Sequence, residues 1–242
     1  MLDIIPKIIH YCWFGGNPIP VSYQCYIDSW RRLMPDYQII QWDEKKFDVK
    51  GIPFTAEAYE KKKYAYVSDY ARLKILYENG GVYFDTDVEM VKPIYDILER
   101  GAWMAFEKNV NAPEAAINVN PGLGFACEAG NPIIREIMEY YENNHYVLSD
   151  GTLQQIPIVP ITTNVLKRHG LQLSDIPLQL NNITIYPWEY FCPIEYLSNK
   201  CELTYNTRTI HHYAATWMSF ADKMKMKKGY WITKIKRFLK HE

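Results

Sequence analysis

Short apolar segments that alternate with amphipathic segments constrain the fold of this chain more than any other feature of its sequence. We expect strands over residues 4–14, 37–42, 82–90, 101–106, 183–186 and 209–213, and helices over residues 21–34, 55–63, 66–79, 131–141 and 161–169. Gly80 and Gly81 end the helix over 66–79. Strands that alternate with helices predict an α/β fold, in which a mainly parallel central sheet has helices on both faces.

Composition and charge limit the classes of protein and of partner. The 242 residues include 48% hydrophobic and 23% charged residues, which is ordinary for a globular protein. A formal net charge of −1 argues against a nucleic-acid partner, which would favour a basic balance. The five cysteines show no CxxC spacing, so the sequence predicts neither a zinc site nor a disulfide framework. With no expected signal peptide or apolar run of about 20 residues, we expect a cytoplasmic location.

The last 21 residues differ from the rest of the chain. Residues 222–242 carry lysines and one arginine among Trp231, Ile235, Phe238 and Leu239, whose spacing is helical. A basic amphipathic helix with aromatic residues is typical of segments that bind a membrane surface, although it is equally typical of a helix packed on its own domain. We therefore expect one domain over residues 1–221 and a basic helix over residues 222–242, with possible peripheral contact at the inner face of the plasma membrane.

Two acids at the end of a predicted strand mark the candidate site. Asp85 and Asp87 lie in the segment GGVYFDTDVEM, and the period of two in a strand places both on one face. Two neighbouring carboxylates repel each other and are costly to bury without a counter-charge. Because Mg²⁺ and Mn²⁺ bind one or two carboxylates together with substrate phosphates, we expect a metal–diphosphate site at this position.

The helix before this strand supplies two further candidates. Asp69 and Arg72 are three residues apart and therefore lie on one helix face. Since the next strand returns close to this helix, Arg72 is expected near the metal site. Taken alone, the two residues are more typical of a surface ion pair that contributes only a few tenths of a kcal/mol, but beside the DxD acids and Gly80-Gly81 a role in the site is favoured.

The segment SDYARLKILYENGGVYFDTDVEM resembles the DXD sugar-binding region of glycosyltransferase family 32, and it is similar to the glucosylating clostridial toxins. The opening IPKIIHYCWFGG and the late HHYAATW resemble the first strand and the closing segment of that family. The resemblance implies a GT-A fold and a hexose transferred from a nucleotide-diphosphate sugar, with UDP favoured and GDP possible. It also implies Mn²⁺ or Mg²⁺, a saccharide or lipid-linked saccharide acceptor, a role in surface polysaccharide synthesis, and retention of configuration.

The resemblance also implies roles for individual residues. Trp13 would stack on the base of the donor, Asp69 and Arg72 would contact the donor sugar, and Trp217 would approach the leaving phosphate. Asp85 and Asp87 would hold the metal, joined by His211 or His212. In an extended segment these two histidines point to opposite faces, so only one can be a ligand, and His212 matches the usual ligand position slightly better.

Other interpretations and departures from the family pattern are part of the same analysis. The stretch IVPITTNVLKRHG resembles the corresponding family segment only loosely, which leaves Thr163 and Asn164 in doubt as sugar contacts. Residues 118–125 are expected to form a glycine-containing loop beside the site. A DxD phosphohydrolase with a nucleophilic first Asp fits poorly, because Glu89 stands where Thr or Val is usual. An inactive module that only binds nucleotide sugars is the other alternative.

Overall fold

The computed structural model describes residues 5–108, 118–195, 198 and 200–214. Trp217 and the predicted helix over 222–242 lie outside these residues. The strands are β1 (Ile8–Cys12), β2 (Gln38–Trp42), β3 (Gly81–Tyr83), β4 (Val88–Met90), β5 (Ala102–Ala105), β6 (Phe125–Cys127), β7 (Leu178–Leu180), β8 (Ile183–Tyr186) and β9 (Thr209–His211). The helices are α1 (Val21–Leu33), α2 (Pro53–Glu60), α3 (Tyr64–Asn79), α4 (Tyr95–Leu98), the 3₁₀ turn η1 (Pro121–Leu123), α5 (Pro132–Glu142), α6 (Ile158–Arg168) and α7 (Trp188–Phe191).

A seven-stranded sheet organises the described part of the chain, in the order β2-β1-β3-β6-β5-β8-β7. β1 pairs in parallel with β2 and β3, and β5 pairs in parallel with β8, whereas β6 and β7 run antiparallel to their neighbours. Following these pairings across the sheet, five of its seven strands run in one direction. The predicted α/β class with a mainly parallel sheet is therefore confirmed.

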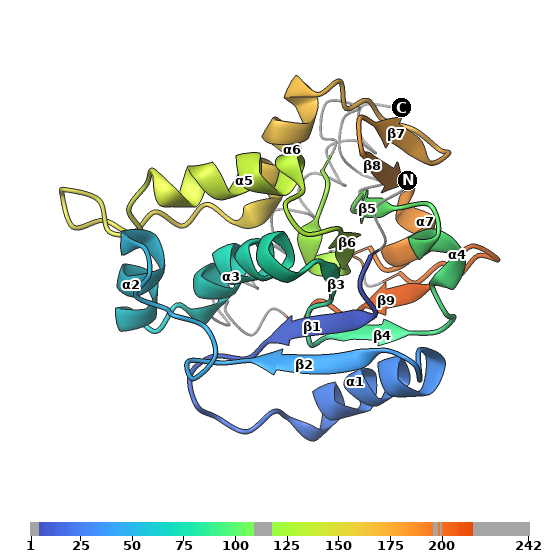
Figure 1. Cartoon of the computed structure of the whole chain (residues 1–242), viewed down its shortest axis with the longest axis horizontal. Helices are drawn as coiled ribbons and strands as arrows, with labels where there is room; N and C mark the ends of the chain where they lie inside the picture. Colours follow the sequence, from blue (N-terminus) through green and yellow to red (C-terminus); the bar gives the residue numbers. More distant parts are fainter. Residues whose placement is uncertain (1–4, 109–117, 196–197, 199, 215–242) are drawn as a thin grey trace, which may run out of the picture.

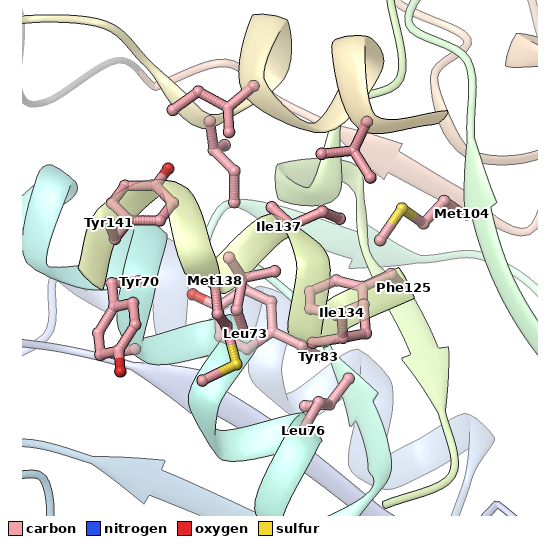
Figure 2. Close-up of a cluster of buried hydrophobic side chains, with 14 of the residues drawn as sticks. Tyr70, Leu73, Leu76, Tyr83, Met104, Phe125, Ile134, Ile137, Met138 and Tyr141 are labelled. Atoms are coloured by element: carbon pink, nitrogen blue, oxygen red, sulfur yellow. The ribbon is translucent and has the colours of Figure 1, made fainter. Parts of the chain in front are cut away.

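Each face of the sheet covers a separate hydrophobic core. α2, α3, α5 and α6 pack on one face, and α1, α4 and α7 pack on the other (Figure 1). Strand β5 shows the division directly, because Met104 belongs to the first core and Trp103 to the second. In the first core, side chains of α3 and α5 interdigitate above Phe125 of the sheet (Figure 2). Helices on both faces bury the central strands and leave the strand ends for a ligand.

The single strand predicted over residues 82–90 is wrong. The chain forms β3, leaves the main sheet at Phe84, turns through Asp87, and continues as β4, which pairs antiparallel with β9 in a second, two-stranded sheet. Phe84 is fully buried in the second core and packs so closely on Gly124 that a Cβ there would lie 2.4 Å from the ring. Val82 and Phe84 lie in the second core and Tyr83 in the first, so the side chains alternate as in a strand up to Phe84. The amide of Phe84 still donates to the carbonyl of His10 at 3.1 Å, and β3 ends at the turn that follows.

None of the described helices combines the length and the apolar character needed to cross a membrane.

Candidate active site at the junction of the two sheets

The two acids of the DxD motif lie in the turn that joins the main sheet to the small sheet. Asp85 and Asp87 follow β3 and precede β4, and the amide of Val88 donates to the carbonyl of Asp85 at 3.1 Å. Our argument that both acids share one face of a strand therefore fails, since neither is in a strand. The turn nevertheless brings one oxygen of each carboxylate together with a ring nitrogen of His211, all three within 4.8 Å of one another.

Arg72 connects α3 to the first acid, as predicted. One terminal nitrogen of its guanidinium lies 3.1 Å from Asp69 and the other lies 3.2 Å from Asp85, and the side chain is only 5% exposed. The hydroxyl of Tyr83 donates to the other oxygen of Asp85 at 2.9 Å. Burial raises the pKa of Asp85, and the charge of Arg72 opposes this rise. The Asp69–Arg72 pair is thus buried and bridges to the site, so it is not a surface ion pair.

Asp69 has a second partner besides Arg72. Its Oδ2 accepts from the amide of Ile158 at the start of α6, at 3.3 Å. Burial raises the pKa of Asp69 to about 6, although Arg72 acts in the opposite direction. Asp69 therefore links α3 to the N-terminus of α6 and also holds Arg72 in place beside Asp85.

Asp87 is held by the chain around β9. Its Oδ2 accepts from the amide of Ala214 at 2.8 Å, and its Oδ1 lies 3.3 Å from Nε2 of His211. Burial favours a raised pKa for Asp87, but His211 and the Ala214 amide outweigh it and lower the pKa to about 2. Burial would likewise lower the pKa of His211, but the negative charge of Asp87 raises it. The second acid is therefore ionised at neutral pH and is available to a cation.

The donor set fits a divalent cation. Two carboxylates and an imidazole suit Mn²⁺ or Mg²⁺ with open positions left for phosphate oxygens. The buried Nδ1 of His211 has no hydrogen-bond partner among the described residues, and buried polar atoms without a partner are rare. Nε2 is the ring nitrogen that faces Asp87, so a cation between the acids and this ring would bind Nε2 and offset the negative charge of the two carboxylates.

The two histidines lie on opposite sides of their segment, as predicted. His212 faces away from the acid pair: its Nε2 lies 2.9 Å from Glu89, and its ring stacks on Tyr26 at 4.4 Å. The described geometry therefore favours His211 as the ligand, against our slight preference for His212. The register of the β4–β9 ladder explains why His211 is the nearer histidine, because it pairs His211 with Val88, which directly follows Asp87.

Trp13 lies just beyond the end of β1, as expected for a residue near the strand ends. Its indole nitrogen donates to the carbonyl of Asn17 at 2.7 Å, and its partly exposed ring meets the edge of Tyr23 at 5.9 Å. The ring is therefore fixed by neighbours yet retains an accessible surface, which a base could cover.

The glycine-containing loop over residues 118–125 lies beside the site, as predicted. A Cβ on Gly122 would lie 2.7 Å from Oδ2 of Asp85, so only glycine permits this close approach. Thr163 is buried and accepts from the amide of Val119, whereas Asn164 is exposed. Thr163 therefore holds the loop in place through this hydrogen bond.

A surface hollow of about 550 Å³ lies along β2, and the acids are not among its lining residues.

Sequence reasoning missed three polar residues of the site: Glu107, Asn120 and Tyr213. Glu107 follows β5 and accepts from Asn120 at 3.0 Å and from Tyr213 at 2.9 Å. Their positions after β5, before η1 and after β9 follow the rule that polar residues beyond strand ends form sites. These three residues lie in separate segments, and no spacing between them in the sequence predicts that their side chains come into contact.

Comparison with known proteins finds a family resemblance in the N-terminal half of the chain. A family model described as "Glycosyltransferase sugar-binding region containing DXD motif" matches residues 20–105, which include Asp69, Arg72, Asp85 and Asp87. Residues 20–105 therefore resemble this DXD glycosyltransferase family. The match covers the acids and the arginine that the structure brings together, so the family and the geometry agree, and the phosphohydrolase alternative is not supported.

The curated proteins that resemble this chain include fungal mannosyltransferases. The chain is 29% identical over 150 residues to "Inositol phosphoceramide mannosyltransferase 3" of Schizosaccharomyces pombe, which is 59% of this chain and 40% of the relative. It is 28% identical over 126 residues to "Initiation-specific alpha-1,6-mannosyltransferase" of Candida albicans, which is 48% of this chain and 33% of that relative. The chain thus spans well under two thirds of the length of these relatives.

Solved structures similar to this chain include two whose titles name glycosyltransferases. "PaToxG Glycosyltransferase" matches 69% of this chain and 70% of its own with 22% identity and a TM-score of 0.48. The galactosyltransferase LgtC, solved "in complex with donor and acceptor sugar analogs", matches 92% of this chain and 95% of its own with 11% identity and a TM-score of 0.45. Scores at this level carry no argument about substrate or mechanism.

Proposed function

We propose that the protein is a metal-dependent glycosyltransferase that moves a hexose from a nucleotide-diphosphate sugar to a saccharide acceptor. The observation that carries the proposal is the convergence of Asp85, Asp87 and His211 at the junction of the two sheets. A bound Mn²⁺ or Mg²⁺ would supply positive charge to the diphosphate as it leaves. Asp87 and His211 would hold the ion, with Asp85 beside them.

The protein's own residues would bind and orient the donor. The Trp13 ring would cover the base at the end of β1, while Asp69 and Arg72 would contact the sugar. The Arg72 guanidinium is already held by Asp69 and Asp85, so it needs no rearrangement to donate to a sugar oxygen. Trp217, which lies outside the described residues, would approach the leaving phosphate. Retention of configuration is proposed on family resemblance.

The donor and acceptor classes follow from chemistry and from the names of relatives. A UDP-sugar is favoured, and a GDP-sugar is the second choice because the relatives are named mannosyltransferases. The first of these names specifies a phosphoceramide acceptor, which supports a lipid-linked saccharide as the acceptor here. Surface polysaccharide synthesis at the cytoplasmic face of the plasma membrane is the corresponding cellular role.

The experiment is a comparison of donor binding and turnover in wild type and Asp87→Ala. Calorimetric titration with UDP and with GDP, each with and without Mn²⁺, should show binding only when the metal is present. Hydrolysis of UDP-glucose, UDP-galactose and GDP-mannose should follow the preferred nucleotide, and Asp87→Ala should reduce it by about 10²-fold or more. Glu99→Gln, an exposed acid after α4, is the control. Metal-independent hydrolysis, or an unaffected Asp87→Ala protein, would refute the proposal. Binding without turnover would favour the inactive module.

Membrane contact is proposed for the basic segment over residues 222–242. Deletion of these residues should reduce sedimentation with vesicles that contain anionic phospholipid, and the loss should shrink as salt rises. Neutral vesicles are the control for charge. Equal sedimentation of the two proteins would show that the segment does not bind the surface.

A further inference from the structure

Glu107 is a third carboxylate beside the acid cluster, and its orientation is fixed by the protein. It lies two residues after the end of β5 and is half-buried. Its Oε1 accepts from Nδ2 of Asn120 at 3.0 Å and from the hydroxyl of Tyr213 at 2.9 Å. Among the described residues, no hydrogen bond or ion pair engages its Oε2. One carboxylate oxygen is therefore fully used and the other keeps its capacity to accept.

The two partners of Glu107 connect it to the cluster of acids and His211 by different routes. The ring of Tyr213 meets His211 edge to face at 4.3 Å. The side-chain oxygen of Asn120 accepts from the amide of Gly122, the glycine that closely approaches Asp85. Glu107 does not belong to the group of ligand atoms formed by the acids and His211. Glu107 therefore lies next to the candidate cation site but is not one of its candidate ligands.

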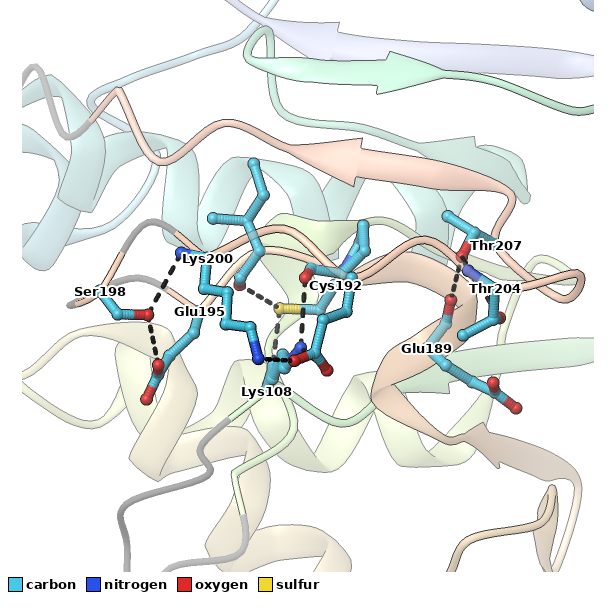
Figure 3. Close-up of polar contacts among 11 residues, drawn as sticks. Lys108, Glu189, Cys192, Glu195, Ser198, Lys200, Thr204 and Thr207 are labelled. Carbon is cyan, nitrogen blue, oxygen red and sulfur yellow. Dashed lines mark hydrogen bonds and ion pairs between the residues drawn. The ribbon is translucent and has the colours of Figure 1, made fainter.

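Lys108 follows Glu107 in the chain but does not form an ion pair with it. Lys108 is buried and directs its ammonium away, to Glu202 at 2.7 Å and over the ring of Trp188 at 4.0 Å. The thiol of Cys192 accepts from the amide of Lys108 at 3.3 Å (Figure 3). The same sulfur lies 3.0 Å from the hydroxyl of Tyr213. These contacts fix the backbone at residues 107 and 108, so the orientation of the Glu107 side chain is set before any ligand binds.

Charge and hydrogen bonding determine which part of a substrate suits this carboxylate. An anionic diphosphate would be repelled by Glu107, whereas a neutral sugar hydroxyl donates to a carboxylate oxygen. We propose that Glu107 binds the saccharide acceptor, accepting a hydrogen bond from an acceptor hydroxyl through Oε2, with Asn120 and Tyr213 as its positioning residues. This assignment rests on the proposed glycosyltransferase function and adds the residue that meets the incoming sugar.

The test separates donor binding from acceptor use. Wild type, Glu107→Gln, Tyr213→Phe and the control Glu99→Gln are compared by three measurements: calorimetric binding of UDP or GDP with Mn²⁺, donor hydrolysis, and transfer to methyl α-glucoside, α-galactoside and α-mannoside. For the glycoside that wild type uses best, Glu107→Gln should reduce transfer per acceptor concentration by about 10- to 100-fold, the value of one charged hydrogen bond. Nucleotide binding and donor hydrolysis should stay within about 3-fold of wild type, and Tyr213→Phe should give a smaller loss of the same kind.

The outcomes distinguish this assignment from the function on which it rests. Wild type that binds no nucleotide with Mn²⁺ and cleaves no donor overturns the proposed function and Glu107's role together. Wild type that is active while Glu107→Gln transfers normally overturns the role of Glu107 alone. An equal loss of Mn²⁺-dependent binding, hydrolysis and transfer in Glu107→Gln also overturns it, because Glu107 would then support the cation. The melting temperature of Glu107→Gln, measured in parallel, should match that of wild type.

Discussion

At the scale of single residues, the site depends on how closely the backbone of Gly122 approaches Asp85. A Cβ at this position would lie 2.7 Å from Oδ2 of Asp85 and 2.9 Å from the side-chain oxygen of Asn120. We expect Gly122→Ala to displace the first acid and to weaken Mn²⁺-dependent nucleotide binding by about 10-fold or more, since small displacements in a site are costly. Gly51→Ala, where the nearest atom lies at 3.3 Å, is the control in the same calorimetric titration. Equal affinity of both variants would show that the close approach is not needed.

His10 gives a prediction about pH at the same scale. Its Nδ1 accepts from the indole of Trp42 at 3.0 Å, so the neutral ring donates through Nε2 to the carbonyl of Gly80 at 3.1 Å. Burial lowers the pKa of His10 from 6.5 to about 4. Between pH 6.5 and pH 4, His10 is protonated in the unfolded chain but stays neutral in the folded chain. The stability that His10 contributes is therefore present above pH 6.5 and is lost as the pH falls toward 4.

The measurement is urea unfolding of wild type and His10→Gln at pH 7 and pH 5. The slope from one such group is at most about 1.4 kcal/mol per pH unit, so wild type should lose roughly 2 kcal/mol more than the variant over this interval. Glutamine can accept and donate but does not titrate, which makes it the matched substitution. An equal loss in both proteins would mean that His10 is not the group responsible.

At the scale of elements, helix α5 depends on its N-cap. The side chain of Asn131 is fully buried and accepts from the amides of Ile133 at 3.0 Å and Ile134 at 3.3 Å, and Pro132 follows at the first helical position. Asn131→Ala should destabilise the protein by about 1–2 kcal/mol in denaturant unfolding, because two buried amides lose their acceptor. Asn131→Asp should recover part of this loss. Asn143→Ala at the exposed end of the same helix should cost less than about 0.5 kcal/mol.

The sequence predicted most elements from periodicity and from their Pro and Gly boundaries, and it failed where tertiary contacts decide. Residues 82–90 alternate like one strand, yet the turn through Asp85 and Asp87 divides them between two sheets, because β4 pairs with the distant β9. Strands β6 and β7 were not predicted, because three-residue segments are too short to show a period. The acids and Arg72 could be predicted because they lie close together in the sequence. Glu107, Asn120 and Tyr213 could not, because only the folded sheet brings them together.

At the scale of the whole molecule, one sheet separates two cores that share its strands. Trp103 stacks on Phe191 at 4.0 Å on one face, and its neighbour Met104 is buried on the other. Because β1, β3, β5, β6 and β8 each contribute buried side chains to both cores, we expect one cooperative unfolding transition. Trp103→Ala should cost about 3–5 kcal/mol and Met104→Ala about 2–5 kcal/mol. Both should move the same transition when near-UV and far-UV circular dichroism are followed together. Two separated transitions in either variant would show that the cores unfold independently.

The turn between β3 and β4 has a consequence for how the molecule is made. Asp85 and Asp87 leave the ribosome early, whereas His211 arrives with the last described strand, β9, which is also the partner that β4 needs to form its ladder. A nascent or prematurely terminated polypeptide that stops before β9 therefore carries the motif without its third ligand and without the small sheet. Under the proposed function, metal-dependent donor binding would then arise in a single late event, once β9 has been added.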